Sequence, residues 1–145
     1  MIRLLENTRR PDITFNRNGR IFIAARVARL LSLAPGDALN IALNCNEISC
    51  QRAQCGIHSN IAECSRDCAK GEYLLYVIHK PFGRHEAQCY PTKQGSHNFC
   101  ANSARLARAL MDACNISTTR VAFMIGQQIT IQETVYCPII TRYPL

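Results

Sequence analysis

Arginine residues near the start of this sequence have the type and spacing needed to bind a polyanion. Residues 1–30 contain seven arginines and two acidic residues, a local net charge of +5, and the whole chain carries +7. A guanidinium group can hydrogen-bond two phosphate oxygens, or the edge of a guanine base, at once. The segment therefore favours duplex DNA as a partner, and its candidate contacts are Arg17, Arg20, Arg26 and Arg29.

A second group of cationic residues follows a similar pattern later in the chain. The segment 104–110, ARLARAL, repeats much of the segment 25–31, ARVARLL, at a constant offset of 79 residues. The tripeptide 93–95 precedes the second copy much as 17–19 precedes the first. Asp112 is one helical turn beyond the last arginine of this copy and is expected to pair with it. We predict an internal duplication whose second half adds weaker DNA contacts through Lys93, Arg105 and Arg108.

Four potential metal ligands form the motif Cys55-x2-His58-x5-Cys64-x3-Cys68. Thiolate and imidazole groups are the ligands that tetrahedral zinc takes. The intervals match no standard zinc motif, and other cysteines nearby indicate that this chain uses cysteine as a small apolar residue. We predict no bound metal and no other cofactor, with zinc at these four residues as the open alternative.

A cysteine nucleophile is a further hypothesis, because Cys89, His97 and Cys100 lie close together in the sequence. The chain has no glycine-rich phosphate loop, no Gly-x-Ser-x-Gly motif and no His-Glu-x-x-His motif. Proximity along the chain does not by itself make a catalytic pair. We therefore predict that the protein is not an enzyme and that Cys89, Cys100 and Cys137 fill the core.

Short alternating segments and turn residues predict the elements that position the first arginines. Residues 12–17 and 20–23 alternate apolar with polar side chains on either side of Asn18-Gly19, a strong hairpin turn. A helix over 24–33 follows, because its apolar residues recur at i, i+3 and i+4. A Pro-Gly-Asp turn then leads into further strands, predicted over 38–43 and 48–52.

The remaining chain is predicted to contain an insertion and a second, diverged copy of the same unit. Residues 53–72 combine turn residues and cysteines without a clean period, which indicates an insertion or linker between a first repeat at 1–52 and a second at 73–145. The second repeat is expected to form one compact domain with the first. Its predicted elements are strands over 73–79, 86–90, 121–125 and 129–135 and a helix over 101–113.

Residues 17–52 resemble the AbrB/SpoVT/MazE superfamily of swapped-hairpin proteins. Two positions depart from the pattern, since Ala24 replaces the usual proline at the helix start and Ala28 replaces one of two paired helix arginines. Ile13 also stands where other members carry arginine, and the second copy, residues 86–136, matches less well. The residues that carry the resemblance are Gly19, Arg20, Ile21, Ile23, Arg29, Leu31, Leu33, Gly36, Asp37, Leu39 and Ile41.

In that superfamily two copies interlock into one small β-barrel that presents basic residues to DNA. The resemblance implies a mainly β fold of the α+β type, in which two β-β-α-β-β half-barrels form an AbrB-like pseudo-dimeric barrel with two short helices. It also implies a DNA-binding transcription regulator, as a monomer or an oligomer of pseudo-dimers, with Arg20 and Arg29 as its anchors. The open alternative is an antitoxin-like protein-interaction module of the same fold without DNA binding.

Bulk composition sets the outer limits of these expectations. With 145 residues, 48% of them apolar, the chain can bury the core of one domain. No apolar run approaches the roughly 18 residues of a membrane-spanning helix, and residues 1–10 lack the apolar centre of a secretory signal. We expect a cytoplasmic protein without a membrane partner, whose nine cysteines are reduced. Its predicted core residues are Ile21, Ile23, Val27, Leu31, Leu39, Ile41, Leu75, Val77, Leu106, Leu110, Val121 and Phe123.

Overall fold

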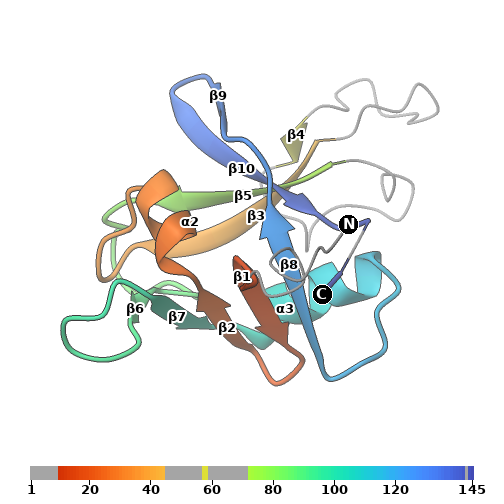
Figure 1. Cartoon of the computed structure of the whole chain (residues 1–145). Helices are drawn as coiled ribbons and strands as arrows, with labels where there is room; N and C mark the ends of the chain where they lie inside the picture. The colour runs from red at the N-terminus through yellow and green to blue at the C-terminus, as the bar shows by residue number, and fades with distance from the viewer. Residues whose placement is uncertain (1–9, 45–56, 59–71, 143) are drawn as a thin grey trace, which may run out of the picture.

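The computed structural model describes residues 10–44, 57–58, 72–142 and 144–145. Their strands form one curled antiparallel sheet with two helices beside it, so the predicted mainly β class is confirmed (Figure 1). The elements in chain order are β1 (Ile13–Asn16), β2 (Arg20–Ile23), α2 (Ala25–Leu30), β3 (Ala38–Asn44), β4 (Ile57–His58), β5 (Glu72–Ile78), β6 (Tyr90–Pro91), β7 (Phe99–Asn102), α3 (Ala104–Ala113), β8 (Arg120–Ile125), β9 (Ile129–Ile131) and β10 (Thr134–Ile140).

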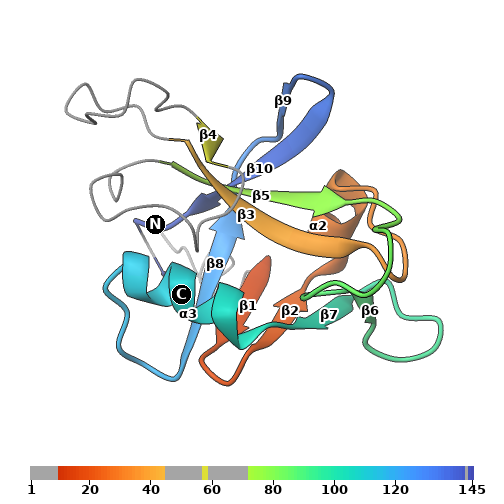
Figure 2. The ribbon, with the colours of Figure 1, turned by 180° about the vertical axis from the view of Figure 1, so that it is seen from behind.

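Neighbouring strands follow the order β4-β3-β5-β10-β8-β1-β2-β7-β6, and β9 forms a hairpin with β10. Residues just before β6 hydrogen-bond back to the start of β3, because Leu39 N–H donates to Ala87 O and Cys89 N–H donates to Asp37 O. The segment before β6, which is the last strand in this order, therefore lies against β3 near the other end of the order. The sheet thus curls toward a barrel (Figure 2).

The predicted β1–β2 hairpin forms, and its turn fits closely against the second helix. Gly19 N–H donates to Asn16 O over 2.8 Å, and Gly19 adopts a φ of +108°, which disfavours any residue with a Cβ. A Cβ at Gly19 would lie 2.6 Å from Ala104 N. Glycine is therefore required here both by the backbone conformation and by the approach of α3.

Both helices end in the same way, although they differ in length. Ser32 after α2 and Asn115 after α3 have positive φ, and the next residue of each donates its N–H back to the helix, Leu33 to Ala28 O and Ile116 to Met111 O. The left-handed residue ends α2 before residue 33, so the predicted helix over 24–33 is too long.

The start of α3 has a conventional side-chain cap. Ser103 Oγ accepts a hydrogen bond from Leu106 N–H, so the helix begins at Ala104 and residues 99–102 form β7. The predicted start at residue 101 was wrong, because residues 101 and 102 still pair with β2.

The core lies on the concave side of the sheet. All twelve residues predicted to be buried have exposed fractions of 8% or less. They form one cluster with Phe15 and with partly buried residues of both helices, and the Phe15 and Phe123 rings meet edge to face at 6.2 Å. Alternation therefore identified the inward face of each strand correctly.

Two strand predictions required correction, and one lies outside the described residues. In the segment 86–90, Glu86 and Ala87 form a turn with Ala87 at positive φ, Gln88 makes an isolated antiparallel bridge with Ala38, and Tyr90 begins β6. The predicted strand over 129–135 is instead a hairpin, because Gln132 and Glu133 turn the chain from β9 into β10. The strand predicted over 48–52 cannot be compared, since those residues are not described.

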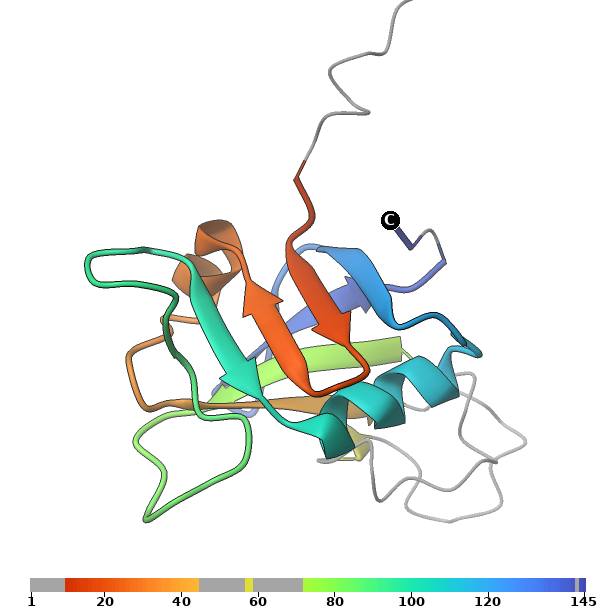
Figure 3. The ribbon, with the colours of Figure 1, turned by 90° about the horizontal axis from the view of Figure 1, so that it is seen from below.

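Seen from below, β1, β2 and β7 form a layer with the two helices at opposite ends (Figure 3). α2 follows the upper end of β2 in this view, and α3 follows the lower end of β7. Among the described residues, neither helix is long and apolar enough to cross a membrane.

Candidate nucleic-acid interface

Arg20 lies on the outer face of the sheet at the start of β2. Ile21 and Ile23 are fully buried, so Arg20 and Phe22 point to the opposite face. The Arg20 side chain is exposed, and its guanidinium group makes no hydrogen bond or ion pair with any residue described by the structure. Its neighbour across the β2–β7 pair is Asn102, which is also exposed. Arg20 is therefore free to bind an external acceptor.

Arg29 lies in the last turn of α2 and is also exposed. The helix buries Val27 and Ala28 against the core, which leaves Arg29 exposed. Within the described ranges, the Arg29 guanidinium group also has no partner. The two residues predicted as anchors are thus both available.

Arg17 holds β1 to the end of α3. Its Nη1 donates to Asp112 Oδ1 over 3.1 Å, its Nε donates to Thr118 O over 3.3 Å, and its Nη2 donates to Ile116 O. Asp112 was predicted to pair with Arg108, but the structure pairs it with Arg17, which approaches from a different part of the chain. Arg108 instead donates through Nε to the Arg17 carbonyl over 3.0 Å. The hydrogen bonds of Arg17 are therefore largely used within the fold.

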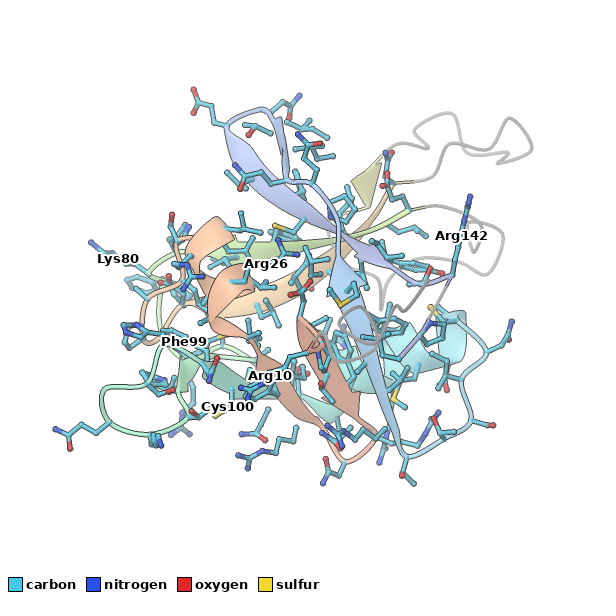
Figure 4. The ribbon with its side chains drawn as sticks, viewed as in Figure 1. Arg10, Arg26, Lys80, Phe99, Cys100 and Arg142 are labelled. Carbon is cyan, nitrogen blue, oxygen red and sulfur yellow. The ribbon has the colours of Figure 1, made fainter. Side chains whose placement is uncertain are left out.

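Arg26 joins the start of α2 to the segments before β1 and at the end of β8. Its Nε and Nη2 donate to the two carboxylate oxygens of Asp12 over 3.1 and 2.7 Å, and Nη2 also donates to Ile125 O over 2.8 Å. The Asp12 hydrogen bonds raise the pKa of Arg26 above its ordinary value. Figure 4 shows Arg26 between α2 and the sheet. Arg26, like Arg17, thus serves mainly to hold the fold together.

The second set of predicted contacts is exposed but unevenly placed. Lys93 lies in the loop between β6 and β7, and Arg105 and Arg108 lie on the exposed face of α3. Arg105 Nη1 is 4.0 Å from Glu86 Oε1, so this guanidinium group faces a carboxylate. Lys93 and Arg108 are therefore the better placed members of the second set for an external anion.

Two acidic residues are buried and internally bonded. Asp12 bonds Arg26 as described, and Asp37 accepts hydrogen bonds from Ala34 N–H, from Lys80 N–H and from His79 Nδ1 over 2.8 to 3.0 Å. Burial acts to raise the pKa of Asp37, but these hydrogen bonds outweigh it and lower the pKa below the usual value. Asp12 therefore compensates Arg26, and neither buried carboxylate pairs with Arg20 or Arg29 in the described structure.

Among the described cysteines, Cys89 is not placed to act as a nucleophile with His97. Cys89 is fully buried, and burial raises the pKa of its thiol to about 12. Its Sγ lies 3.4 Å from Ala87 O, whereas His97 is exposed on the β6–β7 loop. Cys89 and Cys137 fill the core as predicted, but Cys100 lies on the outer face of β7 and is only partly buried. Figure 4 shows Phe99 and Cys100 on opposite sides of that strand.

The proposed zinc ligands remain untested. Cys55, Cys64 and Cys68 lie outside the described residues, and only the backbone of His58 belongs to a described strand. In the part of the chain that the structure describes, no three histidine, cysteine or acidic side chains cluster as metal ligands would.

An apolar row on the outer face was missed in the sequence. Phe22 lies opposite Cys100, and Cys100 lies opposite Tyr90, so the three side chains cross β2, β7 and β6 in register. Phe22 and Cys100 are partly exposed and Tyr90 is 51% exposed. Alternation along β7 could have placed Cys100 outward, but the pairing of the three strands could not be read from it.

No family model, curated protein or solved structure matches this chain.

Proposed function

We propose that this chain is a small DNA-binding regulator of AbrB-like type, built as a fused pseudo-dimer of two swapped-hairpin repeats. The first repeat contains β1, β2, α2 and β3, and the second contains β6, β7, α3 and β8. A regulator of this kind would act in the cytoplasm, where the described free thiols would stay reduced.

The pairing of β2 with β7 is compatible with the pseudo-dimer. Ile21 lies opposite Ala101 and Ile23 lies opposite Phe99. At an offset of 78 residues Ile21 corresponds to Phe99 and Ile23 to Ala101, and all four side chains are buried. The two strands therefore match in their inward faces at an offset one residue shorter than the 79 residues that relate the two helices.

The contacts at the starts of α2 and α3 are equivalent to each other. Ala25 N–H at the start of α2 donates to Asn98 Oδ1 over 2.9 Å. At the offset of 79 residues that relates the two helices, Ala25 corresponds to Ala104 and Gly19 corresponds to Asn98. Ala104 at the start of α3 lies directly against Gly19. Each helix therefore begins against the hairpin of the other half, as expected for interlocked repeats.

The observation that carries the DNA proposal is that Arg20 and Arg29 are exposed and have no partner among the described residues, while Arg17 and Arg26 are bonded internally. Exposed guanidinium groups without an internal carboxylate can neutralise phosphates and release counterions. Lys93 and Arg108 add positive charge from the second half. We assign phosphate contact to these four residues, with Arg20 and Arg29 as the anchors.

Fluorescence anisotropy with a labelled 20-base-pair duplex, measured between 50 and 200 mM salt, tests this assignment. The double variant Arg20→Ala, Arg29→Ala is expected to weaken binding and to reduce the slope of log K against log salt by about 1.8, since each lost phosphate contact removes about 0.9. Both side chains are exposed and unbonded in the described chain, so the variant should keep the wild-type unfolding temperature.

The double variant Arg84→Ala, Arg142→Ala is the matched control. It removes the same net charge from exposed residues outside β2 and α2, and Arg142 lies on the side of the molecule away from α2 (Figure 4). An equal loss of slope in the control would show that only total charge matters. An unchanged slope in the Arg20, Arg29 variant would remove the proposed anchors.

The second candidate function is a protein-interaction module of the same fold, and the apolar row of Phe22, Cys100 and Tyr90 favours it. A partly exposed apolar row across three strands is a feature of surfaces that bind other proteins. In that case the wild-type chain should show no salt-dependent affinity for the duplex.

A further inference from the structure

A cavity of about 220 Å³ lies between the start of β3, the end of β5 and the first turn of α3. The loop that leads from β5 to β6 closes one side of it through His85 and Glu86. Figure 3 shows this loop beside the start of α3. The volume equals that of about seven water molecules in the liquid, so the cavity fits only a small ligand.

The walls of the cavity differ in character. Leu39, Ile78 and Leu106 provide aliphatic surface. On the other side, Glu86 and Arg105 present opposite charges next to each other. A cavity with an apolar wall and a few convergent polar groups is the usual form of a small-molecule site.

The two charges are held in place but do not satisfy each other. Ser103 Oγ donates to Glu86 Oε2 over 3.0 Å and so orients the carboxylate. The other oxygen, Oε1, is 4.0 Å from Arg105 Nη1, which is longer than a hydrogen bond. Both side chains are more than half exposed, so the pair keeps hydrogen-bonding capacity for a ligand.

The equivalent arginine of the first half shows what a closed pair looks like in this fold. Arg26 occupies the position of Arg105 in the matching helix segment, and it also pairs with a carboxylate that precedes a hairpin. Arg26 meets Asp12 at 2.7 Å, and the Asp12 side chain is only 5% exposed. The Glu86–Arg105 pair is therefore longer and more exposed than the Asp12–Arg26 pair, and the cavity lies beside Glu86 and Arg105.

We propose that this cavity binds a small zwitterion of the α-amino-acid type with an aliphatic side chain. Arg105 would bind the ligand carboxylate, Glu86 would bind its ammonium group, and Leu39, Ile78 and Leu106 would contact its side chain. An α-amino acid carries both charges on one carbon, so it can reach two opposite charges that are neighbours. The proposal does not depend on DNA binding.

Nuclear magnetic resonance titration of the ¹⁵N-labelled full chain tests the proposal without any DNA. The probes are L-valine, L-leucine and L-methionine, each compared with 4-methylpentanoate, which lacks the ammonium group, and 3-methylbutylamine, which lacks the carboxylate. At least one amino acid should shift the amide signals of Ala87, Ser103 and Leu106, and it should bind at least tenfold more tightly than either single-charge analogue.

Glu86→Gln and Arg105→Gln each remove one charge and should weaken amino-acid binding at least tenfold. Gln at position 86 keeps an oxygen that Ser103 can donate to, so the loop should stay in place. Glu133→Gln, which changes an exposed acid on the β9–β10 turn, is the matched control and should bind like the wild type. No shift with any of the three amino acids at 10 mM, or equal binding of 4-methylpentanoate, would overturn the proposal.

Discussion

Replacement of Gly19 by alanine should destabilise this protein more than the same change at any other glycine with positive φ in the described chain. Gly19 has a φ of +108°, and its missing Cβ would lie 2.6 Å from Ala104 N and 2.9 Å from Ala104 Cα. Both neighbouring atoms belong to the backbone at the start of α3, so they cannot move aside as a flexible side chain would. The substitution should therefore force the β1–β2 turn and α3 apart.

The size of the effect follows from two separate costs. A residue with a Cβ pays about 1–2 kcal/mol for the left-handed region, and forcing extra atoms into a packed site costs about 1–3 kcal/mol. Gly19→Ala should thus lower the free energy of unfolding by about 2–5 kcal/mol. For a chain of this length each kcal/mol lowers Tm by about 3 °C, so Tm should fall by about 6–15 °C.

Gly95→Ala is the matched control, because Gly95 also has positive φ but a Cβ there would meet nothing within 4 Å. It should lower the free energy of unfolding by only about 1–2 kcal/mol. Urea unfolding followed by circular dichroism gives both values under the same conditions. If the two variants lost the same stability, the close approach of α3 to the hairpin turn would be refuted.

Three further outcomes are expected. Asp12→Ala should lower the free energy of unfolding by about 2–4 kcal/mol in urea titrations, because the buried Ile125 N–H and the Arg26 guanidinium group lose their acceptor. Asp12→Asn keeps an acceptor for Ile125 and should lower the free energy of unfolding by less. The pKa of Asp37 is lower in the folded protein than in the unfolded chain, so the ionised carboxylate stabilises the fold. This stabilisation is complete above the unfolded pKa, about 3.9, and is lost as pH falls through the folded pKa. Asp37→Asn should therefore flatten the dependence of Tm on acidic pH. Because burial raises the pKa of Cys89 to about 12, iodoacetamide at pH 8 should leave this thiol unmodified in the folded protein and alkylate it in urea, as mass spectrometry can measure.

Local patterns were sufficient to predict the class of the fold and part of its core, since the twelve predicted core residues are all buried but are fewer than half of the buried apolar residues in the described chain. Alternating residues report which side of a strand is buried, so the predicted core residues of β2, β3, β5 and β8 were correct. The β1–β2 hairpin forms as well, but its turn spans residues 17–19 with Gly19 alone at positive φ, instead of the two-residue turn predicted at Asn18-Gly19. The limits of elements were less accurate. The helix predicted to reach residue 33 ends at Leu30, and the strand predicted over 86–90 is replaced by a turn at 86–87, an isolated bridge at Gln88 and the start of β6 at Tyr90.

The candidate site divided the predicted arginines in a way that local pattern does not encode. Arg20 and Arg29 have no partner in the ranges that the structure describes, whereas Arg17 bonds Asp112, which is 95 residues away. The three arginines belong to the same hairpin and the helix that follows it, and they have the same side chain. Their different roles arise from which distant segments lie beside them.

The sequence by itself determined the alternation, the hairpin turn, the excess of positive charge and the repeated helix segment, because each of these depends on neighbouring residues. Only the tertiary structure decided that β2 pairs with β7, that Arg26 meets Asp12 and Ile125, and that the Glu86–Arg105 pair stays open beside a cavity. These contacts depend on the path of the whole chain, because burial and hydrogen bonding bring together groups that no sequence period connects.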